Sequence, residues 1–185
     1  MSPLPLFLKK ILIKIFNFVF NNPNIGLKAG NLYLIAKKWK VINLKKPILI
    51  TGAAGFIGAN LARYFVSKGI RINIIIKKNS NLWRIKDVID KMNVYYAELN
   101  DVNKLRKIIK KIKPKTIFHL SAHGAYSDQN NLSKIKESIF DSTYNLINEC
   151  KKYKFNTFIN TGSSSEYGFK KNKMSESDVL VPNSY

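Results

Sequence analysis

The chain has 185 residues, of which 45% are hydrophobic and 12% aromatic, and this composition excludes a wholly disordered protein. The length suffices for one buried core with an extension. The net charge of +21 comes from 28 lysines and only four arginines, spread along the whole chain. Because arginine is preferred for reading bases and gripping phosphates, we expect no dedicated nucleic-acid surface. The single cysteine, Cys150, excludes an internal disulfide, and two histidines leave little material for a metal site, so we expect none.

Residues 1–46 differ from the rest and are expected to form a helical amino-terminal extension. Residues 4–20 are strongly apolar, and polar side chains recur at helical spacing at Lys10, Lys14 and Asn17, which predicts an amphipathic basic helix. The lysines within this run argue against a transmembrane span and against a signal peptide. Two interpretations stay open: the helix docks on the domain or on a second subunit, or it contacts a membrane surface. We expect a cytoplasmic location, with peripheral membrane contact as the second possibility.

From residue 47 onward, short apolar runs alternate with helical patterns. Strands are predicted at residues 48–51, 71–76, 94–97, 116–120 and 157–161. Helices are predicted at residues 56–68, 83–91, 102–112 and 135–152. Strands that alternate with helices predict an α/β fold, a Rossmann-type doubly wound parallel sheet with helices on both faces.

The segment ILITGAAGFIG places Gly52, Gly55 and Gly58 directly after the first strand, where the first helix begins. Glycine permits a tight turn there and lets the backbone approach a pyrophosphate closely. The first helical turn begins with Phe56 and Ile57, and its amides and the helix dipole stabilise phosphate charge. The strand–turn–helix context therefore predicts dinucleotide binding. The alternative is a tight turn that holds no ligand.

The spacing TGxxGxxG resembles that of the extended short-chain dehydrogenases/reductases. The words TGAAGFIG resemble the NAD(P)-dependent nucleotide-sugar epimerases and dehydratases of that branch. The resemblance covers residues 47–185 and implies an NAD(P)-binding Rossmann domain and a nucleotide-sugar substrate. It reaches only the amino-terminal part of the family's enzymes, whose carboxyl-terminal domain grips the nucleotide-sugar.

The end of the second strand bears on the choice of coenzyme. An acidic residue there normally binds the ribose hydroxyls of NAD. In this chain Lys77 and Lys78 occupy that place, and Asp87 lies too far downstream. Two cations suit the additional phosphate of NADP, so we expect NADP, with NAD as the alternative. The competing interpretation is compositional, because lysine is abundant throughout the chain.

Three further segments imply site residues through the same resemblance. YYAELND is similar to the stretch that contacts adenine, with Glu98 and Leu99 in place of the usual aspartate and aliphatic residue. FHLSA is similar to the end of the fourth strand, where Ser121 and Ala122 would lie beside the coenzyme. The loop that begins at His123 is similar to the one that approaches the nicotinamide and the sugar.

The segment SIFDSTYNL resembles the family's N-x-x-G-T-x-N-L helix. Thr143 and Asn145 match this pattern, whereas Ile139 replaces the asparagine and Ser142 the glycine. That asparagine normally organises hydrogen bonds near the active site, so its absence counts against efficient chemistry. The family often forms dimers through helices beside the active site, and this helix is a candidate for such a homodimer. His119, which also matches the family, is interpreted as structural.

The segment NTGSSSEYG follows the fifth strand, at the sheet edge where such folds bind ligands. In the family a Ser or Thr four residues before the YG pair hydrogen-bonds the sugar oxygen, which implies Ser163 here. Tyr185, in VPNSY, fits the catalytic tyrosine of the YxxxK motif. Ser164 and Ser165 replace the Asp-Glu pair of the 4,6-dehydratases, and hydroxyls cannot serve as acid and base near neutral pH. The expected substrate contacts are these two serines and His123.

These residues together imply hydride chemistry without dehydration. We expect an NAD(P)-dependent epimerase or 4-ketoreductase that transfers hydride at C4 of a nucleotide-activated sugar, for surface polysaccharide synthesis. Ser163 would orient the C4 oxygen and Tyr185 would exchange its proton. The lysine that follows the tyrosine in YxxxK lies beyond the last residue of the sequence, so we expect the 185-residue chain alone to be inactive, as a truncated product or a partial sequence. The alternative is a non-catalytic dinucleotide-binding module.

Overall fold

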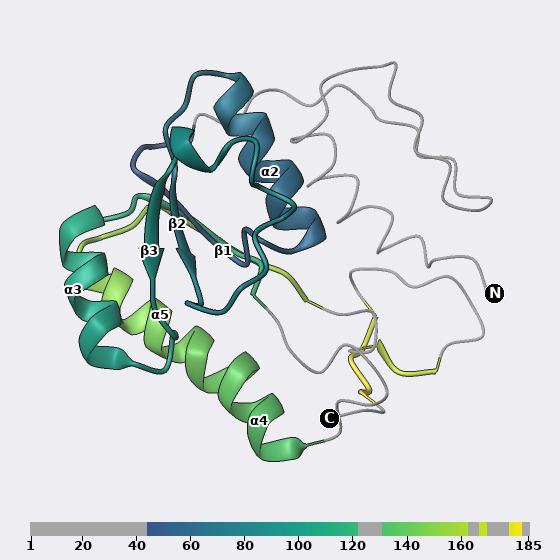
Figure 1. Ribbon diagram of the computed structural model, residues 1–185. Helices are drawn as coiled ribbons and strands as arrows, with labels where there is room; N and C mark the ends of the chain where they lie inside the picture. Colours follow the sequence, from purple (N-terminus) through teal and green to yellow (C-terminus); the bar gives the residue numbers. More distant parts are fainter. Residues whose placement is uncertain (1–43, 122–130, 163–166, 170–177, 183–185) are drawn as a thin grey trace, which may run out of the picture. The chain divides into compact units, whose positions relative to one another are not determined.

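The computed structural model describes residues 44–121, 131–162, 167–169 and 178–182 (Figure 1). The chain divides into two compact units, and the larger, Asn43–Thr161, holds all the strands and helices named below. The extension expected at residues 1–46, with its basic helix at 4–20, lies almost wholly outside the described residues. Its boundary and its contacts therefore stay predictions.

Five short parallel strands form one sheet in the order β3-β2-β1-β4-β5. The strands are β1 Ile48–Thr51, β2 Asn73–Ile76, β3 Asn93–Tyr96, β4 Thr116–His119 and β5 Thr157–Asn160. The central strand, β1, pairs with β2 on one side and with β4 on the other. The strand order thus reverses beside β1, which is where ligands bind in doubly wound folds. The Rossmann-type sheet expected from the sequence is confirmed.

Helices cover both faces of the sheet. Figure 1 shows α2 on one side and α3 with α5 on the other. Their bounds are α2 Phe56–Ser67, α3 Val102–Ile112, α4 Leu132–Lys136 and α5 Ser142–Lys151. As the sequence predicts, α2 stops before Gly69, which has a φ of +69°. Within the described stretches, no helix has both the length and the hydropathy that a membrane span requires.

The side chains of the strands alternate between two apolar layers, as the period of a β-strand dictates. Leu49 and Ile117 belong to the buried cluster that contains the inner faces of α3 and α5, including Leu146. Phe118, the next residue of β4, lies on the opposite face, and its ring centroid is 5.7 Å from that of Phe65 on α2. Each such side chain contributes about 2 kcal/mol when it is fully buried. Apolar side chains therefore pack on both faces of the sheet. This packing fixes the positions of the strand ends at its carboxyl edge.

The helix predicted at residues 83–91 is wrong, because only Ile89–Lys91 is helical, as a single 3₁₀ turn. In an α-helix the carbonyl of Arg84 would accept a hydrogen bond from the amide of Val88. Here that carbonyl accepts from the guanidinium of Arg63 on α2, and the amide of Val88 donates three residues back instead of four. The side chain of Arg63 on α2 therefore binds the carbonyl that an α-helix over residues 83–91 would use as a backbone acceptor.

The long helix predicted at residues 135–152 is present, but it is not α-helical throughout. It starts with α4, passes through the π-turn Glu137–Asp141 and continues directly as α5. Such a turn accommodates one additional residue in the helical repeat. The hydroxyls of Ser142 and Thr143 each donate to the carbonyl four residues earlier. These side chains therefore support the backbone where the helix changes its winding.

The smaller unit contains few described residues. Tyr167 is buried, and the next residue, Gly168, has a φ of +63°. A β-carbon on Gly168 would lie 2.0 Å from the carbonyl oxygen of Val181. The YG pair that follows the serine segment therefore forms a tight turn that only glycine fits.

Candidate functional site

The turn between β1 and α2 requires glycine for two separate reasons. Gly52 has a φ of +70°, a left-handed conformation that other residues adopt only with strain. A β-carbon at this position would also lie 2.5 Å from the carbonyl oxygen of Leu120, just beyond β4. The turn is thus pressed against the end of the neighbouring strand, and its backbone forms the floor of the sheet edge.

The start of α2 is pressed against the same turn. A β-carbon on Gly58 would lie 2.2 Å from the carbonyl oxygen of Gly52, while the amide of Gly55 donates to that oxygen at 3.0 Å. No side chain of the described residues caps the helix at Gly55, and its first turn, which opens with Phe56 and Ile57, carries no acidic residue. The first amides of α2 therefore stay available to an anion.

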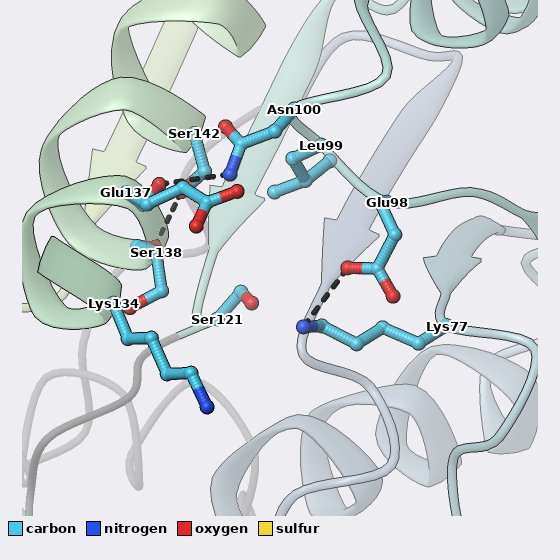
Figure 2. A pocket seen from close by; sticks show the side chains of 9 residues that line it. All are labelled: Lys77, Glu98, Leu99, Asn100, Ser121, Lys134, Glu137, Ser138 and Ser142. Carbon is cyan, nitrogen blue, oxygen red and sulfur yellow. Dashed lines mark hydrogen bonds and ion pairs between the residues drawn. The ribbon is translucent and has the colours of Figure 1, made fainter. Parts of the chain in front are cut away.

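Two adjoining cavities lie at this carboxyl edge of the sheet. One, of about 220 Å³, lies against the glycine turn, and the other, of about 470 Å³, lies against α4 and α5. Lys77, Leu99 and Ser121 line both cavities, so we treat them as one sheet-edge groove. Figure 2 shows the wall of the larger part that comes from the helix, formed by Lys134, Glu137, Ser138 and Ser142.

Lys77 and Glu98 form an ion pair where β2 and β3 end, with 2.9 Å between Nζ and Oε2 (Figure 2). Lys78, the second cation expected here, is exposed. Asp87 is bound elsewhere, because its carboxylate accepts hydrogen bonds from the Arg63 guanidinium at 2.7 and 3.0 Å, which lowers the pKa of Asp87. Of the two cations predicted to bind the coenzyme at the end of β2, Lys77 is therefore already paired with an acid.

Asn145 connects α5 to the loop that follows β3. Its side-chain amide donates to Oδ1 of Asn100 at 3.3 Å and to the carbonyl of Leu99 at 3.5 Å. Asn100 in turn donates to the carbonyl of Glu137 at 3.0 Å. These bonds join the two walls of the larger cavity at its base. The sequence match at Asn145 was the only signal for this connection, and Asn100 was missed.

His119 is buried at the end of β4, within a directed chain of hydrogen bonds. The hydroxyl of Thr143 donates to the carbonyl of Ile139, so it accepts from Nε2 of His119 at 2.8 Å. Nδ1 then carries no proton and accepts from the hydroxyl of Thr51 at 2.6 Å. Burial lowers the pKa of His119 to about 4, so the ring is neutral at pH 7. The histidine thus holds β1, β4 and α5 together, as the structural interpretation requires.

The sequence also matches a known protein family. The sequence model of the NAD dependent epimerase/dehydratase family matches residues 48–185. The chain belongs to this family. It is 33% identical over 130 residues to dTDP-D-glucose 4,6-dehydratase of Dictyostelium discoideum, covering 66% of this chain and 30% of that relative. It is 26% identical over 110 residues to UDP-glucose 4-epimerase of Mycoplasma genitalium, covering 58% of this chain and 32% of that relative.

Solved structures agree with this membership of the epimerase/dehydratase family. MoeE5 in complex with UDP-glucose and NAD aligns with a TM-score of 0.63 and 27% identity, covering 75% of this chain and 44% of that one. The chain spans about a third of the length of the two curated relatives, with shares of 30% and 32%. The resemblance stated from the sequence is therefore confirmed, as is an NAD-dependent enzyme family acting on nucleotide-sugars.

The structure gathers most of the predicted coenzyme residues of this epimerase/dehydratase family member at one place. The groove is lined by Gly52, Gly55, Lys77, Glu98, Leu99 and Ser121. The first turn of α2, beside it, contains Phe56, Ile57 and Gly58. Six predicted residues lie outside the described part of the chain, and their roles stay predictions: Ala122, His123, Ser163, Ser164, Ser165 and Tyr185.

The wall contributed by the helix was not predicted from the sequence. Lys134, Glu137 and Ser138 line the groove from α4 and the π-turn that follows it, which lie far along the chain from the strands on the other side of the groove (Figure 2). Ile139, which replaces the family asparagine, is 44% exposed, whereas Ser142, which replaces the glycine, is buried. In the described stretches, no three His, Cys, Asp or Glu side chains lie close enough to hold a metal ion.

Proposed function

We propose that this protein is an NAD(P)-dependent epimerase or 4-ketoreductase that acts at C4 of a nucleotide-activated sugar. The observation that carries the proposal is the groove from the glycine turn to α5, which is lined at the carboxyl edge of the sheet by the last residues of β1 and β2 and by the residues that follow β2, β3 and β4. The product would be an activated sugar, so we also propose a role in surface polysaccharide synthesis.

The described residues fit a nicotinamide coenzyme. Gly52 and Gly58 let the turn and the start of α2 pack against neighbouring backbone more closely than a β-carbon would allow, and the uncapped amides of α2 suit a diphosphate. The same groove has a polar end at Lys77 and Glu98 for the adenosine ribose. MoeE5, at 27% identity, is described in complex with UDP-glucose and NAD, which supports this assignment.

The chemistry depends on residues that follow β5. In the proposed mechanism, Ser163 hydrogen-bonds the C4 oxygen of the sugar, and Tyr185 accepts the hydroxyl proton on oxidation and returns it on reduction. When it is bound, the coenzyme supplies the hydride acceptor and donor. Ser164 and Ser165 have hydroxyls where a dehydratase needs carboxylates, so water is not eliminated. The relatives include both dehydratases and epimerases, and these two serines favour the second class.

The extra phosphate of NADP is proposed to bind Lys77 and Lys78, which directly follow β2. NAD is the alternative, because Lys77 is paired with Glu98 and the family is described as NAD dependent. Titration of the purified chain with NADPH and with NADH, followed by nicotinamide fluorescence, measures this preference directly. We expect both to bind and NADPH to bind more tightly.

Because the 185-residue chain alone is expected to be inactive, the reaction is tested on a form of the protein that extends past Tyr185 and includes the lysine of YxxxK and the sugar-binding domain, with a panel of UDP-, GDP- and dTDP-sugars and either coenzyme. Epimerisation gives a C4 epimer without net change at 340 nm, whereas a 4-ketoreductase consumes NADPH with a 4-keto sugar. Ser163→Ala and Tyr185→Phe are expected to abolish turnover, while Ser133→Ala, on the exposed start of α4, is the matched control. Formation of a 4-keto-6-deoxy sugar would show that water is eliminated and would contradict the proposal. Coenzyme binding without turnover of any sugar would favour a non-catalytic dinucleotide-binding module.

A further inference from the structure

Two neighbouring strands end in side chains of opposite charge at the adenosine end of the groove. Lys77 follows β2 directly, and Glu98 stands two residues beyond the end of β3. Their side chains lie 2.9 Å apart at Nζ and Oε2, and both line the larger cavity (Figure 2). The side chains are 57% and 55% exposed, so both can reach a ligand without any change in the core.

The position of this pair has a chemical consequence. In dinucleotide folds, a carboxylate at the end of β2 accepts hydrogen bonds from the ribose hydroxyls of NAD, and a cation there accommodates the phosphate of NADP. This chain has no acid at the end of β2, where Lys77 stands. The ion pair nevertheless brings a carboxylate, that of Glu98, to the same place from the neighbouring strand. An acceptor for a diol and a donor for a phosphate therefore lie side by side.

We propose that Glu98 is a specificity-determining residue. It lowers the preference for NADP over NAD and so allows NAD to bind. This inference rests on the proposed coenzyme function. The Glu98 carboxylate accepts from the ribose hydroxyls of NAD, and it repels the additional phosphate of NADP at close range. It also forms an ion pair with the ammonium group of Lys77, which would otherwise be available to bind that phosphate.

The exposure of the pair explains how one site serves both coenzymes. Ion pairs on the surface contribute little to stability, because water solvates both partners well. Lys77 can therefore leave Glu98 for a phosphate at small cost, and it can stay when the ligand is a diol. A buried pair could not exchange partners in this way without leaving a charge unpaired.

The experiment compares coenzyme affinities in three variants of the chain. Glu98→Gln keeps the size of the side chain and removes its charge, and we expect the ratio of NADH to NADPH dissociation constants to rise roughly tenfold. Lys77→Met should lower NADPH affinity more than NADH affinity. Glu137→Gln removes the same charge from the same cavity without touching the Lys77 pair, and we expect the ratio to change less than about twofold.

Adenosine fragments test the same contact without the nicotinamide. 5′-AMP and adenosine 2′,5′-bisphosphate differ only by the 2′-phosphate, so calorimetric titration with each should reproduce the shift in Glu98→Gln. Equal shifts in Glu98→Gln and Glu137→Gln would overturn the assignment, because bulk charge would then account for both. A wild-type chain that is folded and binds neither coenzyme would overturn the proposed function itself, and this inference with it. Thermal unfolding of each variant separates lost binding from lost folding.

Discussion

The carbonyl oxygen of Gly52 occupies the space that a β-carbon on Gly58 would need, at a distance of 2.2 Å. Because this oxygen belongs to the backbone, no change of rotamer can relieve the contact. Gly58 therefore fixes how closely α2 approaches the turn, and with it the position of the first amides of the helix. These amides are the proposed diphosphate contact.

Gly58→Ala is expected to weaken coenzyme binding, although alanine is the better helix former. The added methyl group forces α2 away from the turn, and overpacking of this kind destabilises a protein by about 1–3 kcal/mol. We expect at least a roughly tenfold rise in the NADPH dissociation constant, measured by fluorescence titration. Gly69→Ala is the control, because its β-carbon meets nothing within 4 Å and only the positive φ is strained. Equal coenzyme affinity in both variants would contradict the role given to Gly58.

His119 makes the stability of the chain depend on pH. Its pKa is about 4 in the folded state and 6.5 in the unfolded chain, so only the unfolded chain binds the proton between these values. The contribution is fully present above pH 6.5 and is lost as the pH falls toward 4, by about 3 kcal/mol in total. Urea unfolding across this range should show the loss in the wild type. The His119→Gln variant should lack this component, while the titration of its carboxylates continues.

Cys150 should be unreactive in the folded protein. The residue is fully buried on α5, and burial, with a smaller effect of the Glu149 charge, raises the pKa of its thiol to about 12. At pH 8 the thiolate is therefore scarce and shielded. A thiol reagent should label the native chain only at the rate of unfolding and label the urea-unfolded chain at once. Because Cys150 is the only cysteine, the signal reports this site alone. Rapid labelling of the native chain would contradict the packing of α5.

Arg63 should control the order of the segment after β2. Its guanidinium binds the carbonyl of Arg84 and the carboxylate of Asp87, which together replace the helix expected there. In Arg63→Met we expect amide hydrogen exchange of residues 83–91 to be about tenfold faster, because the carbonyl of Arg84 and the carboxylate of Asp87 lose the guanidinium that binds both. Arg71→Met is the control, since Arg71 binds Asn93 instead. Unchanged exchange in Arg63→Met would show that the turns form without the arginine.

The sheet could be predicted from the sequence because its signals are local. Runs such as 48–51 and 73–76 are short, apolar and rich in isoleucine, and the glycine turn marks where the first crossover starts. The helix at 83–91 could not be assessed in this way, because the bond that prevents it comes from Arg63, which lies 21 residues before Arg84. Local propensity carries no information about such a partner.

The candidate site was predictable in part for the same reason. Gly52 and Gly58 belong to a contiguous motif, so their roles could be read from spacing. The pairing of Lys77 with Glu98 could not, because it depends on β2 and β3 being neighbours in register, with Ile76 opposite Tyr96. The sequence therefore predicts two free cations, although one of them faces an acid.

The π-turn at Glu137–Asp141 shifts the phase of the helix that crosses the groove. On an unbroken helical wheel, Leu132 and Ile139 fall on the same stripe as Leu146, yet these first two are 49% and 44% exposed while Leu146 is fully buried. One inserted residue rotates the earlier half of a helix by about 100° relative to the later half. Deleting a single residue from this turn would therefore rotate the lipophilic sector of the earlier half of the helix by about 100° relative to that of the later half.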